Sequence, residues 1–215
     1  MRFVITIVRW HQNYMNHVDR IKEYCELEGE DYKGSSGNIG EVATKEWPMH
    51  GKIIISKLSI RYATDLPLIL KDLSLTIDAG QSIGVCGRTG SGKSTLMLSL
   101  LRILTYEAGS ILIDDIDIAK LPLNTLRSNI AIIPQDPVLF TLNVRKNLDP
   151  FDQSSDEEIW NALKQCRLYK KINSMENGIM SMVKLGGENF SAGEKQLVCI
   201  ARAILRKPRI LLLDE

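Results

Sequence analysis

The sequence is poor in the features that mark secreted, zinc-binding or nucleic acid-binding proteins. Its four cysteines stand at positions 25, 86, 166 and 199, with no C-x-x-C pair and no zinc-ligand spacing, which suits a reducing cytosol. Cys86 and Cys199 lie in apolar runs, so we predict small buried core residues rather than reactive thiols. The formal net charge is +1 and no basic stripe is present, so we expect no nucleic acid partner.

Long hydrophobic runs are also absent. The apolar stretch Phe3–Val8 is far shorter than the ~20 residues that cross a bilayer, and no signal-peptide cleavage site follows it. Apolar side chains then recur at helical spacing, at Met15, Val18, Ile21 and Cys25. We therefore predict a helix over residues 1–28. Residues 29–50 are rich in glycine and serine and predict a linker.

A phosphate-binding loop is the first motif that is present. Residues 87–94, Gly-Arg-Thr-Gly-Ser-Gly-Lys-Ser, match the pattern G-x-x-x-x-G-K-[ST]. Backbone N–H groups of such a loop wrap around phosphate, Lys93 would reach the β- and γ-phosphates, and the Ser94 hydroxyl would bind Mg²⁺. We predict a short buried strand over 82–86 before the loop and a helix over 95–104 after it. The alternative is a glycine-rich turn that matches the pattern by chance. Such a turn would not need a strand before it and a helix after it.

The second motif lies at residues 210–215, Ile-Leu-Leu-Leu-Asp-Glu. The apolar run predicts a buried strand. Asp214 at its carboxyl end would hold Mg²⁺, directly or through water, and Glu215 would polarise the attacking water as a general base. A core strand with two acids at its solvent end is the alternative. The phosphate loop upstream favours the catalytic interpretation.

The third motif, Phe190-Ser191-Ala192-Gly193-Glu194, lies between the other two. Ser191 and Glu194 have the spacing of a capping box, which predicts that the helix over 195–205 begins here. A helix N-terminus with a free serine hydroxyl and an accessible glycine backbone is also suited to contact a γ-phosphate. The two interpretations are compatible.

The remaining sequence has an α/β pattern. Strands are predicted at the apolar runs 53–55, 73–77, 111–113, 130–133 and 210–213, with a turn at Asp114-Asp115. Ser155 and the acidic residues after it predict a helix that runs through Gln165. No internal repeat is present.

Together these motifs resemble those of the ABC transporter family. Residues 190–194 resemble its signature sequence, usually L-S-G-G-Q, with Glu194 in place of the glutamine. Gln135, in the segment I-P-Q-D-P-V-L-F, resembles the Q-loop glutamine that contacts Mg²⁺ and the attacking water. Tyr62 resembles the aromatic residue that stacks on adenine. Without the resemblance, Gln135 would belong to a proline-bounded turn and Tyr62 would be an ordinary strand tyrosine.

The resemblance implies a specific set of site residues. The implied ATP-binding residues are Tyr62, Gly87, Arg88, Thr89, Gly90, Ser91, Gly92, Lys93, Ser94 and Thr95. The implied Mg²⁺ ligands are Ser94, Gln135 and Asp214, and the implied catalytic residues are Glu215 and Gln135. Ser191, Ala192, Gly193 and Glu194 would contact ATP held by an opposite subunit.

Residues 147–151, N-L-D-P-F, together with the G-R-T-G of the phosphate loop, resemble the second nucleotide-binding domain of subfamily C, the multidrug-resistance-associated type. This implies an α/β, P-loop NTPase (RecA-like) core with an antiparallel β part and a helical subdomain over about 136–205, incomplete at the C-terminus. Residues 1–28 would be the cytoplasmic end of the last transmembrane helix, and 51–215 the nucleotide-binding domain. Its partners would be a second such domain, head to tail, and the transmembrane domains of the transporter, at the cytoplasmic face of a membrane.

The implied function is ATP binding and hydrolysis that drive a membrane exporter. A regulatory nucleotide-binding module without turnover is the alternative, and Glu215 favours hydrolysis. A DNA-repair ATPase is excluded because the interval from Lys93 to Ser191 leaves no room for a long coiled coil. No histidine follows Asp214, so the family's switch histidine is not in this chain, and we expect this chain alone to hydrolyse ATP poorly.

Overall fold

The computed structural model describes residues 2–27, 29, 47–63 and 65–214, and contacts divide the chain into two compact units, 1–32 and 33–215. The predicted general base Glu215 and most of the predicted linker lie outside the described residues.

The described residues of the first unit form the helix α1 (Arg2–Glu26), close to the predicted bounds. Large apolar side chains from Trp10 onward are exposed along it, and the rings of Trp10 and Tyr14 lie 5.9 Å apart. Neither α1 nor any other helix in the described part of the chain is long and apolar enough to cross a membrane.

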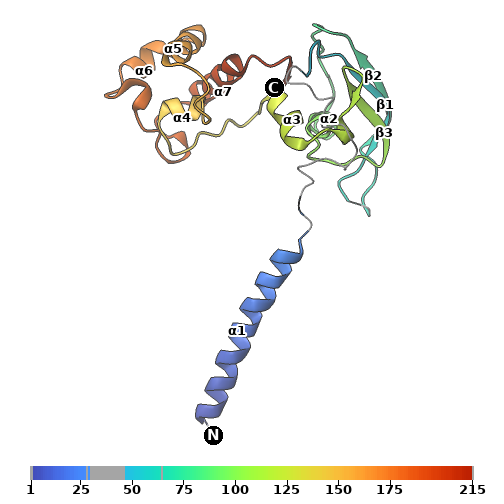
Figure 1. The fold of residues 1–215 in the computed structure, drawn as a ribbon, viewed down its shortest axis with the longest axis vertical. Helices are drawn as coiled ribbons and strands as arrows, with labels where there is room; N and C mark the ends of the chain where they lie inside the picture. Colours follow the sequence, from blue (N-terminus) through green and yellow to red (C-terminus); the bar gives the residue numbers. More distant parts are fainter. Residues whose placement is uncertain (1, 28, 30–46, 64, 215) are drawn as a thin grey trace. The chain divides into compact units, whose positions relative to one another are not determined.

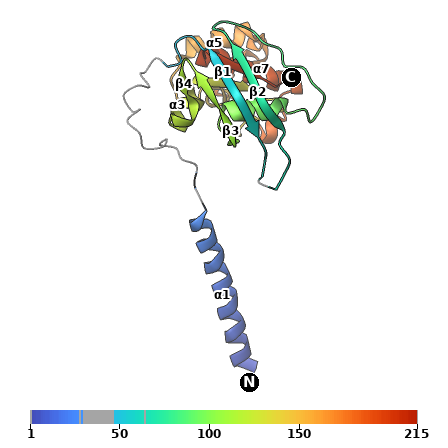
Figure 2. The same cartoon turned by 90° about the vertical axis from the view of Figure 1, so that its right-hand side faces the viewer.

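The second unit contains a four-stranded antiparallel sheet, shown face-on in Figure 2. Its order is β2-β1-β3-β4, with bounds β1 (Ile53–Ile60), β2 (Leu70–Ile77), β3 (Ala108–Ile113) and β4 (Ile116–Asp117). The predicted turn at Asp114 and Asp115 joins β3 to β4 with both residues at positive φ. Where β1 bulges, a Cβ on Gly109 would lie 2.5 Å from the carbonyl oxygen of Lys57, so only glycine fits there.

A separate pair of parallel strands is formed by β5 (Ile130–Ile133) and β6 (Ile210–Leu213), as the continuous apolar runs predicted. Ile133 is paired with Leu213 in this register. The two strands therefore end at the same edge, and the residues after them emerge there together.

The described residues of this unit form six α-helices: α2 (Lys93–Leu100), α3 (Leu123–Asn129), α4 (Val144–Leu148), α5 (Asp156–Gln165), α6 (Tyr169–Asn173) and α7 (Ala192–Arg206). Helix α5 begins at the predicted capping box of Ser155 and Glu158. Helix α2 starts two residues earlier and ends four residues earlier than predicted. Figure 1 shows α4, α5 and α6 gathered at the end of the unit away from the antiparallel sheet.

Two large hydrophobic clusters make up the core of this unit. One joins the antiparallel sheet to α2 and to Ile130 and Ile210 of the parallel pair, and the other lies among α4, α5, α6 and α7. Helix α7 also packs on β5 through Cys199 and Ala203, so it contacts the parallel strands as well as the other helices. Cys199 is buried, as predicted.

The predicted strand over 82–86 is wrong. Residues 81–88 carry no strand hydrogen bonding, and every side chain from 81 to 90 is exposed, including Cys86, which was predicted to be buried. A strand needs a neighbour to pair with, and among the described residues β6 pairs only with β5. The apolar pattern therefore indicates that the segment could form a strand. It does not decide whether the segment pairs with another strand in this structure.

Candidate functional site

The phosphate loop is a tight turn that leads directly into α2. The Ser91 N–H donates to the Arg88 carbonyl oxygen at 3.1 Å, and Gly92 caps the helix at φ 95°. A Cβ on Gly92 would lie 2.8 Å from the Leu70 side chain, so the loop needs glycine here both for its dihedral and for its packing on β2. The N-terminal N–H groups of an eight-residue helix are thereby placed at the end of the loop, where they favour an anion.

Lys93 arches over this loop. Its ammonium donates to the carbonyl oxygens of Gly87, at 2.7 Å, and Arg88, at 3.2 Å. The cation is therefore held at the mouth of the loop by neutral acceptors, and within the described part of the chain no ion pair neutralises it. A phosphate in the loop would meet a full positive charge.

Two of the residues predicted to bind Mg²⁺, Ser94 and Asp214, come together from distant parts of the chain. The Ser94 hydroxyl lies 3.4 Å from both carboxylate oxygens of Asp214, and the Asp214 N–H donates to the Ile133 carbonyl oxygen at 3.0 Å. Gln135 follows β5 by two residues and is exposed at the same edge. Hydroxyl, carboxylate and amide oxygens are hard ligands that suit Mg²⁺.

A ring of protein ligands around a metal is not found in the described part of the chain, where no three His, Cys, Asp or Glu side chains cluster. A Mg²⁺ site of the nucleotide-binding kind takes one or two protein oxygens and completes its shell with phosphate and water. Ser94 and Asp214 fit that description.

Tyr62 lies beside α2, the helix that follows the phosphate loop. Its hydroxyl is 3.1 Å from the Thr95 hydroxyl, which is buried in the first turn of α2. About half of the Tyr62 side chain is exposed, so one end of the ring is fixed near the phosphate loop while a ring face remains accessible. This placement is compatible with the predicted stacking on adenine.

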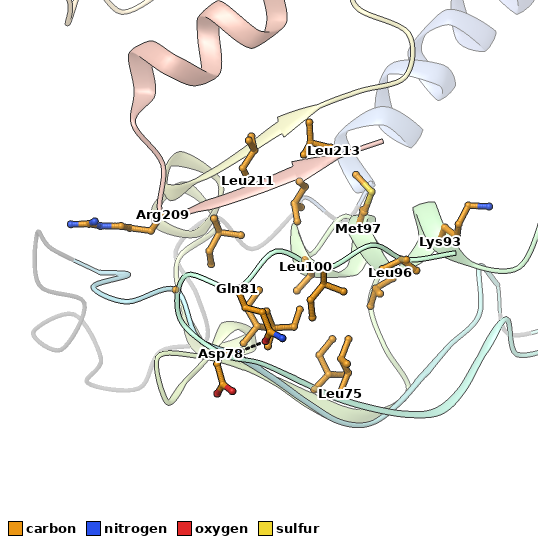
Figure 3. A pocket seen from close by; sticks show the side chains of 18 of the residues that line it. Leu75, Asp78, Gln81, Lys93, Leu96, Met97, Leu100, Arg209, Leu211 and Leu213 are labelled. Atoms are coloured by element: carbon orange, nitrogen blue, oxygen red, sulfur yellow. Dashed lines mark hydrogen bonds between the residues drawn. The ribbon is translucent and has the colours of Figure 1, made fainter. Parts of the chain in front are cut away.

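A cavity of about 290 Å³ lies next to the loop, between the segment 78–85, α2 and β6 (Figure 3). Its walls are mostly apolar side chains such as Leu75, Leu96 and Leu211. Figure 3 shows the Lys93 side chain pointing away from it. Apolar walls do not match the charge of a triphosphate, so we do not assign the nucleotide to this cavity.

The signature segment, residues 190–194, forms the predicted capping box at the start of α7. The Ser191 hydroxyl accepts from the Glu194 N–H at 3.2 Å, and the Glu194 carboxylate accepts from the Ser191 N–H at 2.8 Å. Ser191, Ala192 and Gly193 are exposed, and a Cβ at Gly193 would meet nothing within 4 Å. The serine and the glycine backbone are therefore accessible to a ligand.

Glu194 has a charge partner that sequence reasoning missed. Lys171 of α6 lies 3.5 Å from the Glu194 carboxylate and 5.9 Å from the centre of the Phe190 ring. The hydrogen bond from the Ser191 N–H, and then the Lys171 charge, hold the pKa of Glu194 below its usual value. No sequence signal links residues 171 and 194, because their contact depends on how α6 packs beside α7.

The structure does not join the signature segment to the phosphate loop. Within the described residues, the hydrogen bonds of Ser191 and Glu194 remain in the cap of α7 and none reaches residues 87–95. The predicted residues thus include two separate groups: the phosphate loop with Tyr62 and Asp214, and the exposed N-terminus of α7.

Comparison with known proteins decides the family. A family model described as "ABC transporter" matches residues 70–215, which include the phosphate loop, the signature segment and Asp214. The chain belongs to the ABC transporter family. Its α/β fold is that of the family's P-loop ATPase domain, in which an antiparallel sheet, a parallel pair and a group of helices surround the phosphate loop.

Curated relatives of this ABC domain are members of subfamily C. It is 44% identical over 198 residues to "ATP-binding cassette sub-family C member 2" of Rattus norvegicus, and 41% identical over 222 residues to the "ATP-dependent bile acid permease" of Saccharomyces cerevisiae. These alignments cover 92% and 94% of this chain, which spans only 13% of the length of each relative.

A solved structure of a bacterial Atm1-family ABC exporter with ATP bound is similar in fold. Its TM-score is 0.78 at 28% identity, and the match covers 95% of this chain and 35% of the exporter chain. The domain therefore shares its fold with proteins several times its length.

Proposed function

We propose that this chain is the ATP-binding and ATP-hydrolysing domain of a subfamily C exporter, and specifically its second nucleotide-binding domain. The observation that carries the proposal is the approach of Ser94 to Asp214 at 3.4 Å. It places a hydroxyl and a carboxylate at one point beside the cationic mouth of the phosphate loop. An exporter and an ATP-dependent permease among the similar proteins support transport over a purely regulatory role.

The proposed chemistry assigns a task to each residue. Loop N–H groups and the Lys93 ammonium bind the β- and γ-phosphates, and Tyr62 stacks on adenine. Ser94, Asp214 and Gln135 would hold Mg²⁺, which would supply positive charge to neutralise the phosphates. Glu215 accepts a proton from water as the water oxygen bonds to the γ-phosphorus and the bond to the ADP oxygen breaks.

The exposed N-terminus of α7 suits a role toward another domain's nucleotide. Ser191 and Gly193 are accessible and lie in a helix N-terminus that favours anions. We propose that they contact ATP held by a second nucleotide-binding domain in a head-to-tail pair. In the same scheme α1 is the cytoplasmic end of the last transmembrane helix, and the domain lies at the cytoplasmic face of a membrane.

A chimera tests the transport function. The segment of the yeast bile acid permease that aligns with this chain is replaced by it, and ATP-dependent bile acid uptake is measured in membrane vesicles. We expect uptake by the chimera and its loss on Lys93→Ala, while the exposed Lys120→Ala control retains it. Photolabelling with an ATP analogue verifies that the chimera is folded. Uptake that persists after Lys93→Ala has abolished labelling of this domain would favour the regulatory role.

A further inference from the structure

Arg202 makes the most extensive set of side-chain contacts on α7. Its Nε donates to the Asn147 carbonyl oxygen at 2.6 Å, one Nη donates to the Val138 carbonyl oxygen at 2.9 Å, and the other donates to the Asn147 side-chain oxygen at 3.1 Å. The guanidinium also lies 5.9 Å from the centre of the Phe140 ring. One planar group thus contacts two segments that are 55 and 64 residues away in the sequence.

These contacts fix the loop that follows Gln135. Val138 is three residues after Gln135, and Phe140 is bound from the other side by Asn147, which accepts from its N–H at 2.8 Å and donates to its carbonyl oxygen at 2.9 Å. Asn147 is 3% exposed, so its amide has few alternatives to these partners. Arg202 and Asn147 therefore hold residues 138–140 as a unit against α7.

If the side chain at position 202 served only to fill space, it would not need to be an arginine. Among the described residues, the hydrogen-bond partners of Arg202 are carbonyl oxygens, an amide oxygen and the Cys199 sulfur, with no carboxylate among them. Burial lowers the pKa of Arg202, which is the cost of placing a cation here without an acid. A guanidinium offsets such a cost through geometry, because its rigid donors bind two acceptors in one plane.

The other end of α7 carries the signature segment. Ser191 caps the helix, and the interval to Arg202 is about 16 Å at about 1.5 Å per residue. A continuous helix of 15 residues is stiff over that distance. A movement of residues 138–140 that pulls on Arg202 therefore moves the whole helix, and Ser191 moves with it.

The loop also has space in which to move. A cavity of about 300 Å³ lies beside the guanidinium, lined in part by Ile132, Val138, Phe140 and Cys199. Where α7 meets β5, Cys199 and Ala203 pack against Ala131 and Ile133, with the partly buried Ile200 beside them. The cavity, rather than this contact, gives residues 138–140 room to move.

We propose that Arg202 is a positioning residue that couples the loop carrying Gln135 to the signature segment, so that nucleotide binding at the phosphate loop is transmitted along α7 to Ser191. The proposal rests on the proposed function, since it needs ATP to bind at residues 87–94. The hydrogen bonds of Arg202 reach neither the phosphate loop nor the signature segment. It acts through the loop and the helix that it joins.

Hydrogen exchange of the 215-residue chain, with and without MgATP, tests the coupling. Peptides that cover 87–94 report nucleotide binding, and peptides that cover 189–197 report the response of the signature segment. Arg202→Met removes every donor but keeps the aliphatic stem, and Arg202→Lys keeps one cationic donor. Arg206→Met is the matched control, because Arg206 is exposed one turn later on the same helix.

We expect MgATP to alter exchange at 87–94 in all four proteins. At 189–197 the response should be equal in the native chain and Arg206→Met, at least threefold smaller in Arg202→Met, and intermediate in Arg202→Lys. Thermal unfolding identifies a variant that fails to fold, in which case Arg202→Lys carries the comparison. An undiminished response at 189–197 in folded Arg202 variants would overturn the coupling alone. No response at 87–94 in the native chain would overturn the proposed function and the coupling with it.

Discussion

Ser94 and Asp214 are 120 residues apart in the sequence, and the Ser94 hydroxyl lies 3.4 Å from both Asp214 carboxylate oxygens. Two independent elements produce this approach. Helix α2 places Ser94 in its first turn, and the pairing of β6 with β5 places Asp214 at the strand edge. This pair defines the proposed nucleotide site, while the N-terminus of α7 carries the signature segment.

Replacing Lys93 by alanine should weaken MgATP binding by about 2–3 kcal/mol, because a charge-assisted contact to phosphate is lost and its partner is left unpaired. Titration with a fluorescent ATP analogue measures the affinity. Lys120→Ala, a change at an exposed lysine outside the site, is the control and should bind as the native chain does. Equal affinities for Lys93→Ala and the native protein would contradict the assignment of the loop.

The variants Ser94→Ala and Asp214→Asn should each reduce the part of ATP affinity that depends on Mg²⁺, and their effects should not add. Both side chains would serve one ion, so a double-mutant cycle should show a coupling of about 0.5–3 kcal/mol. The cycle is repeated in EDTA, where we expect the coupling in nucleotide affinity to disappear. Effects that add in the presence of Mg²⁺ would mean that the two residues do not share an ion.

For Tyr62, stacking and the hydroxyl contact with Thr95 can be separated. Tyr62→Ala should lose roughly 1–3 kcal/mol of ATP affinity, by analogy with base stacking on aromatic side chains. Tyr62→Phe removes only the 3.1 Å contact and should retain most of the affinity, as should Tyr62→Trp. Isothermal titration with ATP measures all three. If tryptophan and alanine weaken binding equally, Tyr62 serves the packing of the fold instead.

Protonation of Glu194 should destabilise the N-terminus of α7. The folded-state pKa of Glu194 is lowered, first by the hydrogen bond from the Ser191 N–H and then by the Lys171 charge. The Glu194 carboxylate therefore stabilises the folded state fully at pH values above its ordinary pKa of 4.5. This stabilisation is lost as the pH falls through the folded-state pKa. Glu194→Gln keeps the capping box but should flatten this part of the pH dependence. Glu194→Ala should also cost about 1 kcal/mol near neutrality, since the box is lost.

Urea unfolding at a series of pH values measures these changes in the free energy of unfolding. Glu188→Gln, an exposed acid three residues before Ser191, is the control and should leave the native pH dependence intact. An unchanged pH dependence in Glu194→Gln would show that the carboxylate makes no net contribution in the folded state.

Several parts of the structure followed from local sequence signals. The runs 130–133 and 210–213, the capping boxes at Ser155 and Ser191, and the turn at Asp114 are all present where the sequence predicted them. Each depends on residues within a few positions of one another: an unbroken apolar run, a serine three residues before a glutamate, or two aspartates that tolerate positive φ. The phosphate loop belongs to the same class, because its glycines act through their own backbone.

Other features were decided only by the tertiary structure. The segment 82–86 has the composition of a strand, yet it is unpaired and leaves Cys86 exposed. Lys171 meets Glu194, and Arg202 meets Val138, through contacts that no spacing in the sequence indicates. The physical reason is common to all three. Strand pairing and side-chain partners across elements depend on which surfaces are brought together, whereas caps, turns and loops are determined by the dihedral angles and hydrogen bonds of neighbouring residues.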